Sequence, residues 1–180
     1  MGKLSEYVVS LMDRKRDYSK EEMTVIGYGM ELLFNSMIKI IIYMVVGVII
    51  GKKEDVLFSL LIWCSIRKQS GGWHAKSDAM CFAVSGIAIF LPVVVSPYIK
   101  VKNEWIIIGV IALNIIYLVY APYDEYYVGR RKEKNKVKGK TLLLINIVWI
   151  LGSQLKEKYL YIAMFVLYEQ GILLLHKKSK

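Results

Sequence analysis

The residues best suited to chemistry lie near the middle of the chain, where a histidine precedes a cysteine by seven positions. His74 follows the pair Gly71 and Gly72, and Cys81 stands at the start of a long apolar run. A thiol becomes an effective nucleophile when an imidazole accepts its proton, so the two residues would suit peptide cleavage or acyl transfer. In one continuous helix they would be separated by about 10 Å of rise, too far for a hydrogen bond. We therefore expect the chain to bend between them, close to a glycine pair that permits positive φ angles.

Charged side chains accompany this pair. Arg67, Lys68 and Lys76 would stabilise a thiolate, although the same cations would also suit lipid phosphates. Asp78 lies four residues after the histidine and three before the cysteine, which in a helix places it on their common face. It could orient the imidazole, or it could be a solvated residue at the start of a helix. The spacing leaves both alternatives open.

A histidine and a cysteine near a membrane also fit a transporter or a structural membrane subunit, because most buried thiols are inert. The second thiol, Cys64, lies inside an apolar run, and the second histidine, His176, lies near the end of the chain. The cysteines form no CxxC pair and no spacing typical of metal ligands. We therefore expect no disulfide, no metal site and no cofactor.

The elements that position these residues belong to a membrane protein. Of the 180 residues, 56% are hydrophobic, and the mean hydropathy of +0.41 exceeds what a water-covered surface allows. We predict one integral membrane domain over residues 1–180, with an N-terminal amphipathic arm over 1–22 and a membrane bundle over 28–175. Residues 3–18 place apolar side chains near one helical face, which predicts an interfacial helix or, alternatively, a solubilising extension.

Six apolar runs predict an all-α, polytopic membrane bundle. They cover residues 28–50, 56–66, 79–99, 105–121, 141–153 and 159–175. A helix needs about 20 residues to cross the hydrocarbon core, so the second and fifth runs are too short. These two must include charged flanks, tilt, or enter the membrane only partway as re-entrant segments.

Lysine and arginine are distributed unevenly among the connections. The N-terminal arm, the 67–78 loop, the 129–140 loop and the C-terminal tail together carry 18 of them, whereas the three intervening connections carry 6. Cytoplasmic loops carry the excess of positive charge, so we expect both termini and the loop with His74 at the cytoplasmic face, where thiols stay reduced. These cations border membrane segments rather than a soluble patch, so no nucleic-acid binding is expected.

The order and spacing of these residues resemble the AgrB family, the accessory gene regulator proteins that process quorum-sensing propeptides in Gram-positive bacteria. The resemblance rests on Ile26-Gly27-Tyr28-Gly29-Met30-Glu31, Lys39, Arg67, Gly71, Gly72, His74, Ala75, Cys81, Ser85 and Tyr120-Ala121-Pro122, followed by a basic stretch. It covers most of the chain, although roughly the last 40 residues match only in hydrophobic character.

The resemblance implies a cysteine endopeptidase in the cell membrane of a Gram-positive bacterium, working as a homodimer. It would cleave an AgrD-like propeptide ahead of an acidic C-terminal tail, with Cys81 as nucleophile and His74 as base. Cys81 would hold the upstream part as a thioester until an internal Cys or Ser of the peptide closed a macrocycle. Arg67, the two glycines and Ser85 would support this site. The alternative is a non-enzymatic transporter or peptide-export scaffold, although the sequence lacks the inverted repeats or broken helices typical of a transporter.

Two polar groups are candidates for binding the propeptide. Glu31 and Lys39 belong to a polar stripe with a four-residue repeat on the first apolar run, which suits either peptide binding or pairing between helices. Arg130, Arg131 and Lys132 begin a basic run that would attract an acidic tail, although anionic lipid is an alternative partner.

Overall fold

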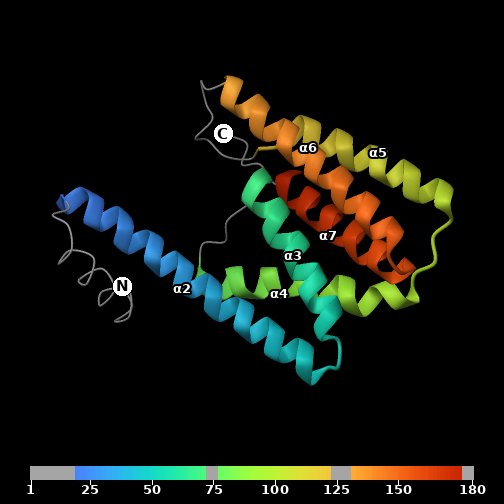
Figure 1. Cartoon of the computed structure of the whole chain (residues 1–180), viewed down its shortest axis with the longest axis horizontal. Coiled ribbons are helices and arrows are strands. Elements are labelled where there is room, and N and C mark those ends of the chain that lie inside the picture. Colours follow the sequence, from blue (N-terminus) through green and yellow to red (C-terminus); the bar gives the residue numbers. More distant parts are fainter. Residues whose placement is uncertain (1–18, 72–76, 123–130, 176–180) are drawn as a thin grey trace. The chain divides into compact units, whose positions relative to one another are not determined.

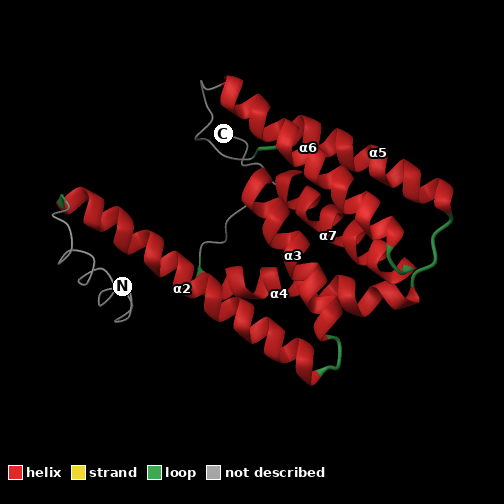
Figure 2. Ribbon diagram, in the orientation of Figure 1, coloured by secondary structure: helices red, strands yellow, loops and turns green. Residues whose placement is uncertain are grey.

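A computed structural model describes residues 19–71, 77–122 and 131–175, and every regular element in these ranges is a helix (Figures 1 and 2). The helices are α2 (Lys20–Ile49), α3 (Lys53–Ser70), α4 (Asp78–Val95), α5 (Asn103–Tyr120), α6 (Arg131–Gln154) and α7 (Glu157–Leu175), with a 3-10 turn η1 (Ser96–Tyr98) after α4. Each of the six apolar runs corresponds to a helix, which confirms the predicted all-α fold. The expected interfacial helix over 3–18 lies outside the described residues.

Four of the described helices are long and apolar enough to cross a membrane: α2, α4 together with η1, α5 and α7. The other two contain the short apolar runs. Helix α3 reaches 18 residues by including charged residues at both ends, from Lys53 to Lys68. Helix α6 begins at Arg131, whereas its apolar run begins at residue 141. The short runs therefore extend into charged flanks, one of the three arrangements expected from their length.

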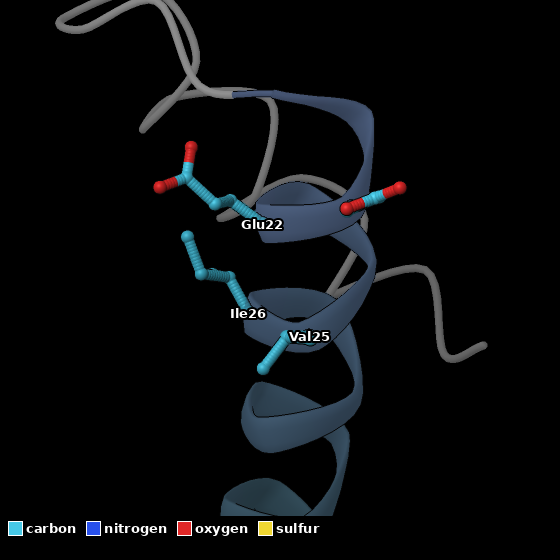
Figure 3. A pocket seen from close by; sticks show the side chains of 4 residues that line it. Glu22, Val25 and Ile26 are labelled. Carbon is cyan, nitrogen blue, oxygen red and sulfur yellow. The ribbon is translucent and has the colours of Figure 1, made fainter.

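The chain divides into two compact units, residues 1–46 and 47–180, and the first contains most of α2. Ser19 caps this helix reciprocally, because its hydroxyl accepts a hydrogen bond from the Glu22 amide (3.2 Å) and its own amide donates to the Glu22 carboxylate (2.9 Å). A shallow hollow lies beside the same turns, with the side chains of Glu22 and Ile26 on one side of the helix (Figure 3). Many apolar side chains of α2 are exposed, which suits a helix surrounded by lipid.

The second unit packs around α7, which contacts α3, α4, α5 and α6 (Figure 1). Ile162, Ala163, Val166 and Leu167 of α7 are fully buried and form the centre of its core. The outer faces of α4 and α5 instead expose large aliphatic side chains. An apolar exterior around an apolar core is what a bundle of membrane helices requires.

Helices α3 and α7 run side by side in the same direction. Asp55 pairs with Lys158 near the start of both helices, and Ser70 contacts Gln170 near their ends. Three helices separate the two in the sequence, so they run parallel if the chain reverses direction at each connection. The contacts therefore agree with a chain that crosses back and forth.

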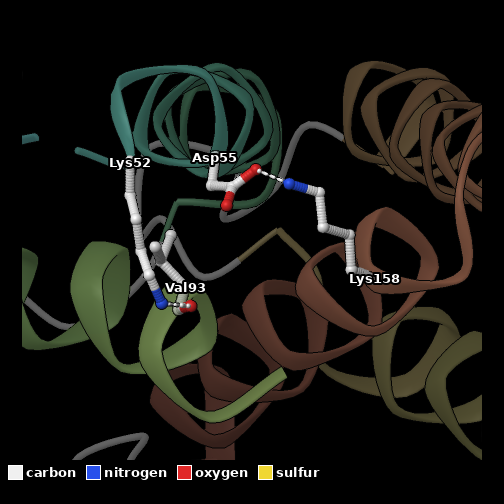
Figure 4. A network of polar contacts seen from close by, with 4 residues as sticks. All are labelled: Lys52, Asp55, Val93 and Lys158. Atoms are coloured by element: carbon white, nitrogen blue, oxygen red, sulfur yellow. Dashed lines mark hydrogen bonds and ion pairs between the residues drawn. The ribbon is translucent and has the colours of Figure 1, made fainter. Parts of the chain in front are cut away.

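The starts of α3 and α7 are held together, and to the end of α4, by polar contacts (Figure 4). The Val93 carbonyl on α4 cannot accept the usual helical hydrogen bond, because Pro97, four residues on, lacks an N–H. Lys52 Nζ donates to this carbonyl instead (3.3 Å), while Lys158 forms an ion pair with Asp55 (2.7 Å). These contacts lie at the start of α3, whereas the candidate site lies near its other end.

Candidate functional site

Helix α4 carries Cys81 at its N-terminal end. Ser77 caps the helix, because its hydroxyl accepts a hydrogen bond from the Met80 amide (3.2 Å) and its carbonyl accepts one from the Cys81 amide (2.9 Å). The Cys81 side chain is half-buried. The amide groups at a helix N-terminus favour nearby negative charge, and Cys81 lies in this part of α4.

Arg67 brings a positive charge to Cys81 from the last turn of α3. Burial lowers the pKa of its guanidinium, and the charges that Cys81 and Cys64 carry as thiolates raise that pKa in return. Both sulfurs thus lie within electrostatic range of this cation. The guanidinium also lies over the Trp63 ring, 5.4 Å from its centroid, which limits the directions in which it can point. The sequence predicted a cation near the thiol, and the charge of Arg67 interacts with that of a Cys81 thiolate.

Gly71 ends α3 and turns the chain towards the loop that contains His74. Its backbone has φ 69° and ψ −147°, a region that only glycine occupies readily, and its amide donates to the Arg67 carbonyl (3.0 Å). The expected positive φ is therefore confirmed at this residue. Gly72 and His74 lie outside the described residues, so the approach of the imidazole to Cys81 stays a prediction.

Gln170 joins α7 to this turn and was missed by sequence analysis. Its side chain is fully buried, and its Nε2 donates to the Ser70 hydroxyl (3.2 Å) and to the Gly71 carbonyl. Its Oε1 accepts a hydrogen bond from Arg67 Nη1 (3.5 Å). The only sequence signal was a polar amide inside an apolar segment, which marks a contact with protein rather than lipid but does not name the partner.

The remaining predicted site residues on α4 occupy different environments. Asp78 is exposed in the first turn, where a carboxylate interacts favourably with the helix N-terminus. Ser85 is half-buried one turn after Cys81, on the same face of the helix. A role of Asp78 in orienting the imidazole stays a prediction, because His74 lies outside the described ranges.

The candidate propeptide-binding residues are distributed over different parts of the chain. Glu31 and Lys39 lie on one face of α2, within the first compact unit. Lys132 is exposed at the start of α6, in the second unit, whereas Arg130 and the Arg131 side chain lie outside the described part. Their contact with a peptide stays a prediction.

An open cavity of about 210 Å³ lies between α3, α4 and α7, further along α4 than Cys81. It is lined by Trp63, Val84, Ile87, Ala88, Glu169, Ile172 and Leu173. The lining is apolar except for Glu169, whose Oε2 is buried without a hydrogen-bond partner. Val84 and Ala88 continue the helical face that carries Cys81, so the cavity begins about one turn from the thiol.

Comparison with known proteins gives one family and several relatives. The family model described as accessory gene regulator B matches residues 5–174. A protein of Clostridium acetobutylicum named AgrB-like is 24% identical over 146 residues, which cover 80% of this chain and 70% of the relative. An AgrB-like protein of Clostridium perfringens is 26% identical over 153 residues (80% and 72%), and protein FsrB of Enterococcus faecalis is 21% identical over 172 residues (91% and 68%). No solved structure matches the chain significantly.

Proposed function

Because the chain belongs to the accessory gene regulator B family, which takes part in processing quorum-sensing propeptides, we propose that it is a membrane cysteine endopeptidase with an AgrD-like propeptide as its substrate. The observation that carries this proposal is the position of Cys81 at the N-terminus of α4 with Arg67 beside it. A helix N-terminus and a nearby cation are features common to the sites of cysteine nucleophiles.

In the proposed reaction, His74 accepts the Cys81 proton and the thiolate attacks the carbonyl carbon ahead of the acidic tail. The peptide C–N bond breaks, the departing amine takes the proton from His74, and the upstream peptide stays on Cys81 as a thioester. An internal Cys or Ser of the peptide then attacks this thioester. Ring closure releases the Cys81 thiol and a macrocyclic thiolactone or lactone.

Ring closure competes with hydrolysis, so the site must keep water away from the thioester. The half-buried Cys81 lies at the end of a helix that is apolar enough to cross a membrane, next to the apolar side chains of the cavity. The basic run that includes Arg130, Arg131 and Lys132 would attract the acidic tail, and Glu31 and Lys39 would contact the peptide from α2. We also propose that the protein works as a homodimer in the cell membrane of a Gram-positive bacterium.

The test uses purified protein in lipid nanodiscs with its AgrD-like propeptide, followed by mass spectrometry. Cys81→Ala and His74→Ala should each abolish cleavage, because a nucleophile and its base act as one unit. Cys64→Ala is the matched control, since it removes the other thiol and should retain processing. A propeptide whose internal nucleophile is replaced by Ala should accumulate a hydroxylamine-sensitive adduct at Cys81.

Normal processing by Cys81→Ala would contradict the mechanism. Movement of intact propeptide across the membrane, with no change in its mass, would instead favour the transporter or export scaffold.

A further inference from the structure

Gln170 uses its whole amide group in the described structure. The side chain is 0% exposed, both donated bonds go to the end of α3, and the carbonyl oxygen accepts from Arg67. A buried amide that forms no bonds is costly, so the apolar surroundings favour this bonded arrangement over any other. The three bonds connect residues about one hundred positions apart in the sequence.

Each bond holds one part of the candidate site. The bonds to the Ser70 hydroxyl and the Gly71 carbonyl fix the point where the chain leaves α3 towards the loop with His74. The bond from Arg67 fixes one nitrogen of a guanidinium that also lies over Trp63 and whose charge interacts with that of a Cys81 thiolate. Glutamine suits this position because one side chain supplies two donors and one acceptor.

We propose that Gln170 is a positioning residue for the peptidase site, which holds Arg67 beside Cys81 and sets the direction of the turn at Gly71. The role of Gln170 in catalysis rests on the proposed function. Gln170 touches neither the thiol nor the peptide, and its effect on the reaction passes through Arg67 and the turn.

The charges around Cys81 determine what the loss of Gln170 would do. Arg67 is a described cation whose charge interacts with that of a thiolate at Cys81. Displacement of Arg67 would remove this favourable interaction. A thiolate at Cys81 would then form less readily and react more slowly.

The test measures the rate of Cys81 alkylation by iodoacetamide as a function of pH. The full chain in nanodiscs carries Cys64→Ala, so that Cys81 is the thiol that reacts. Gln170→Met retains the size of the side chain and removes its hydrogen bonds. We expect the midpoint of the pH profile to rise, with a roughly tenfold slower reaction at neutral pH.

Tyr117→Phe is the matched control. It also removes a buried hydrogen bond to α7, from the Tyr117 hydroxyl to the Leu167 carbonyl (3.0 Å), but at a position away from the site. This variant should keep the original midpoint. Gln170→Asn, which keeps the amide on a shorter side chain, should behave like Gln170→Met and serves if the methionine variant does not fold.

A double variant tests the route of the effect. If Gln170 acts through Arg67, adding Gln170→Met to Arg67→Gln should shift the midpoint no further than Arg67→Gln does alone. Additive shifts, an unchanged midpoint in folded Gln170 variants, or an equal shift in Tyr117→Phe would each overturn the inference. Alkylation needs no propeptide, so a protein that shows these shifts but cleaves nothing would disprove the proposed function and leave the positioning of Arg67 intact.

Discussion

Two neighbouring polar residues on α7 differ in how well their buried side chains are hydrogen-bonded. Gln170 forms hydrogen bonds with every part of its amide, whereas the Oε2 atom of Glu169 is buried without a partner beside an apolar cavity. A buried polar atom without a bond lowers the stability of the folded state, while a fully bonded one costs little. The two positions should therefore respond to substitution in opposite ways.

We expect Glu169→Leu to raise the free energy of unfolding by about 1–3 kcal/mol, because it removes an unbonded polar atom from an apolar cavity. Gln170→Leu is the matched control one residue along, and it should lower stability, since its former partners lose their bonds. Unfolding of the two variants in mixed micelles, followed by circular dichroism, would measure both. Destabilisation by Glu169→Leu would mean that this carboxyl group has a partner in the folded protein.

At the scale of the helix, the ion pair between Asp55 and Lys158 joins the starts of α3 and α7. Its N–O distance is 2.7 Å, and the Asp55 side chain is 11% exposed against 38% for Lys158. The more buried partner would be left without compensation if the other were removed, and an unpaired buried charge is costly.

A double-mutant cycle with Asp55→Ala and Lys158→Ala should give a coupling energy of about 1 kcal/mol in the free energy of unfolding. Pairing Asp55→Ala with Lys156→Ala, an exposed lysine two residues away, should give a coupling near zero. Propeptide processing should remain in both single variants, because the pair lies at the end of α3 opposite Arg67. Loss of processing without loss of stability would place this pair in the catalytic machinery.

The sequence predicted the helices well because each apolar run forms the hydrophobic part of one helix. It missed where α2 and α6 begin, since lysine and glutamate are good helix formers and a helix continues through them after hydropathy has fallen. In the site, short-range spacing was sufficient to suggest Arg67 and Cys81 as neighbours. Gln170 could not be assigned, because its partners lie on another helix and no local pattern encodes that contact.

At the scale of the whole molecule, the distribution of positive charge and the directions of the helices point to the same crossing pattern. Because α3 and α7 run parallel, the connections after both helices would lie on one side of the membrane if both helices cross it. The connection after α3 contains His74, and the C-terminal tail follows α7. Their lysines and arginines favour the cytoplasmic side, so this orientation stays a prediction.

Cysteine labelling in intact cells tests this orientation. In a background without Cys64 and Cys81, an impermeant maleimide added outside should leave Ser77→Cys and Asn135→Cys unlabelled and should label Lys100→Cys. All three positions are exposed, so access through the protein does not limit the reaction. Labelling of all three after permeabilisation is the control. The reverse pattern in intact cells would show that the termini face outward.

The backbone of Gly71 also has a genetic consequence. Every missense mutation in its codon adds a side chain to a residue at φ 69° and ψ −147°, where a Cβ atom is poorly tolerated. At Gly139 on α6, by contrast, an added Cβ would meet nothing within 4 Å. We therefore expect substitutions to be tolerated far less at Gly71 than at Gly139, because of the backbone conformation of the turn that ends α3.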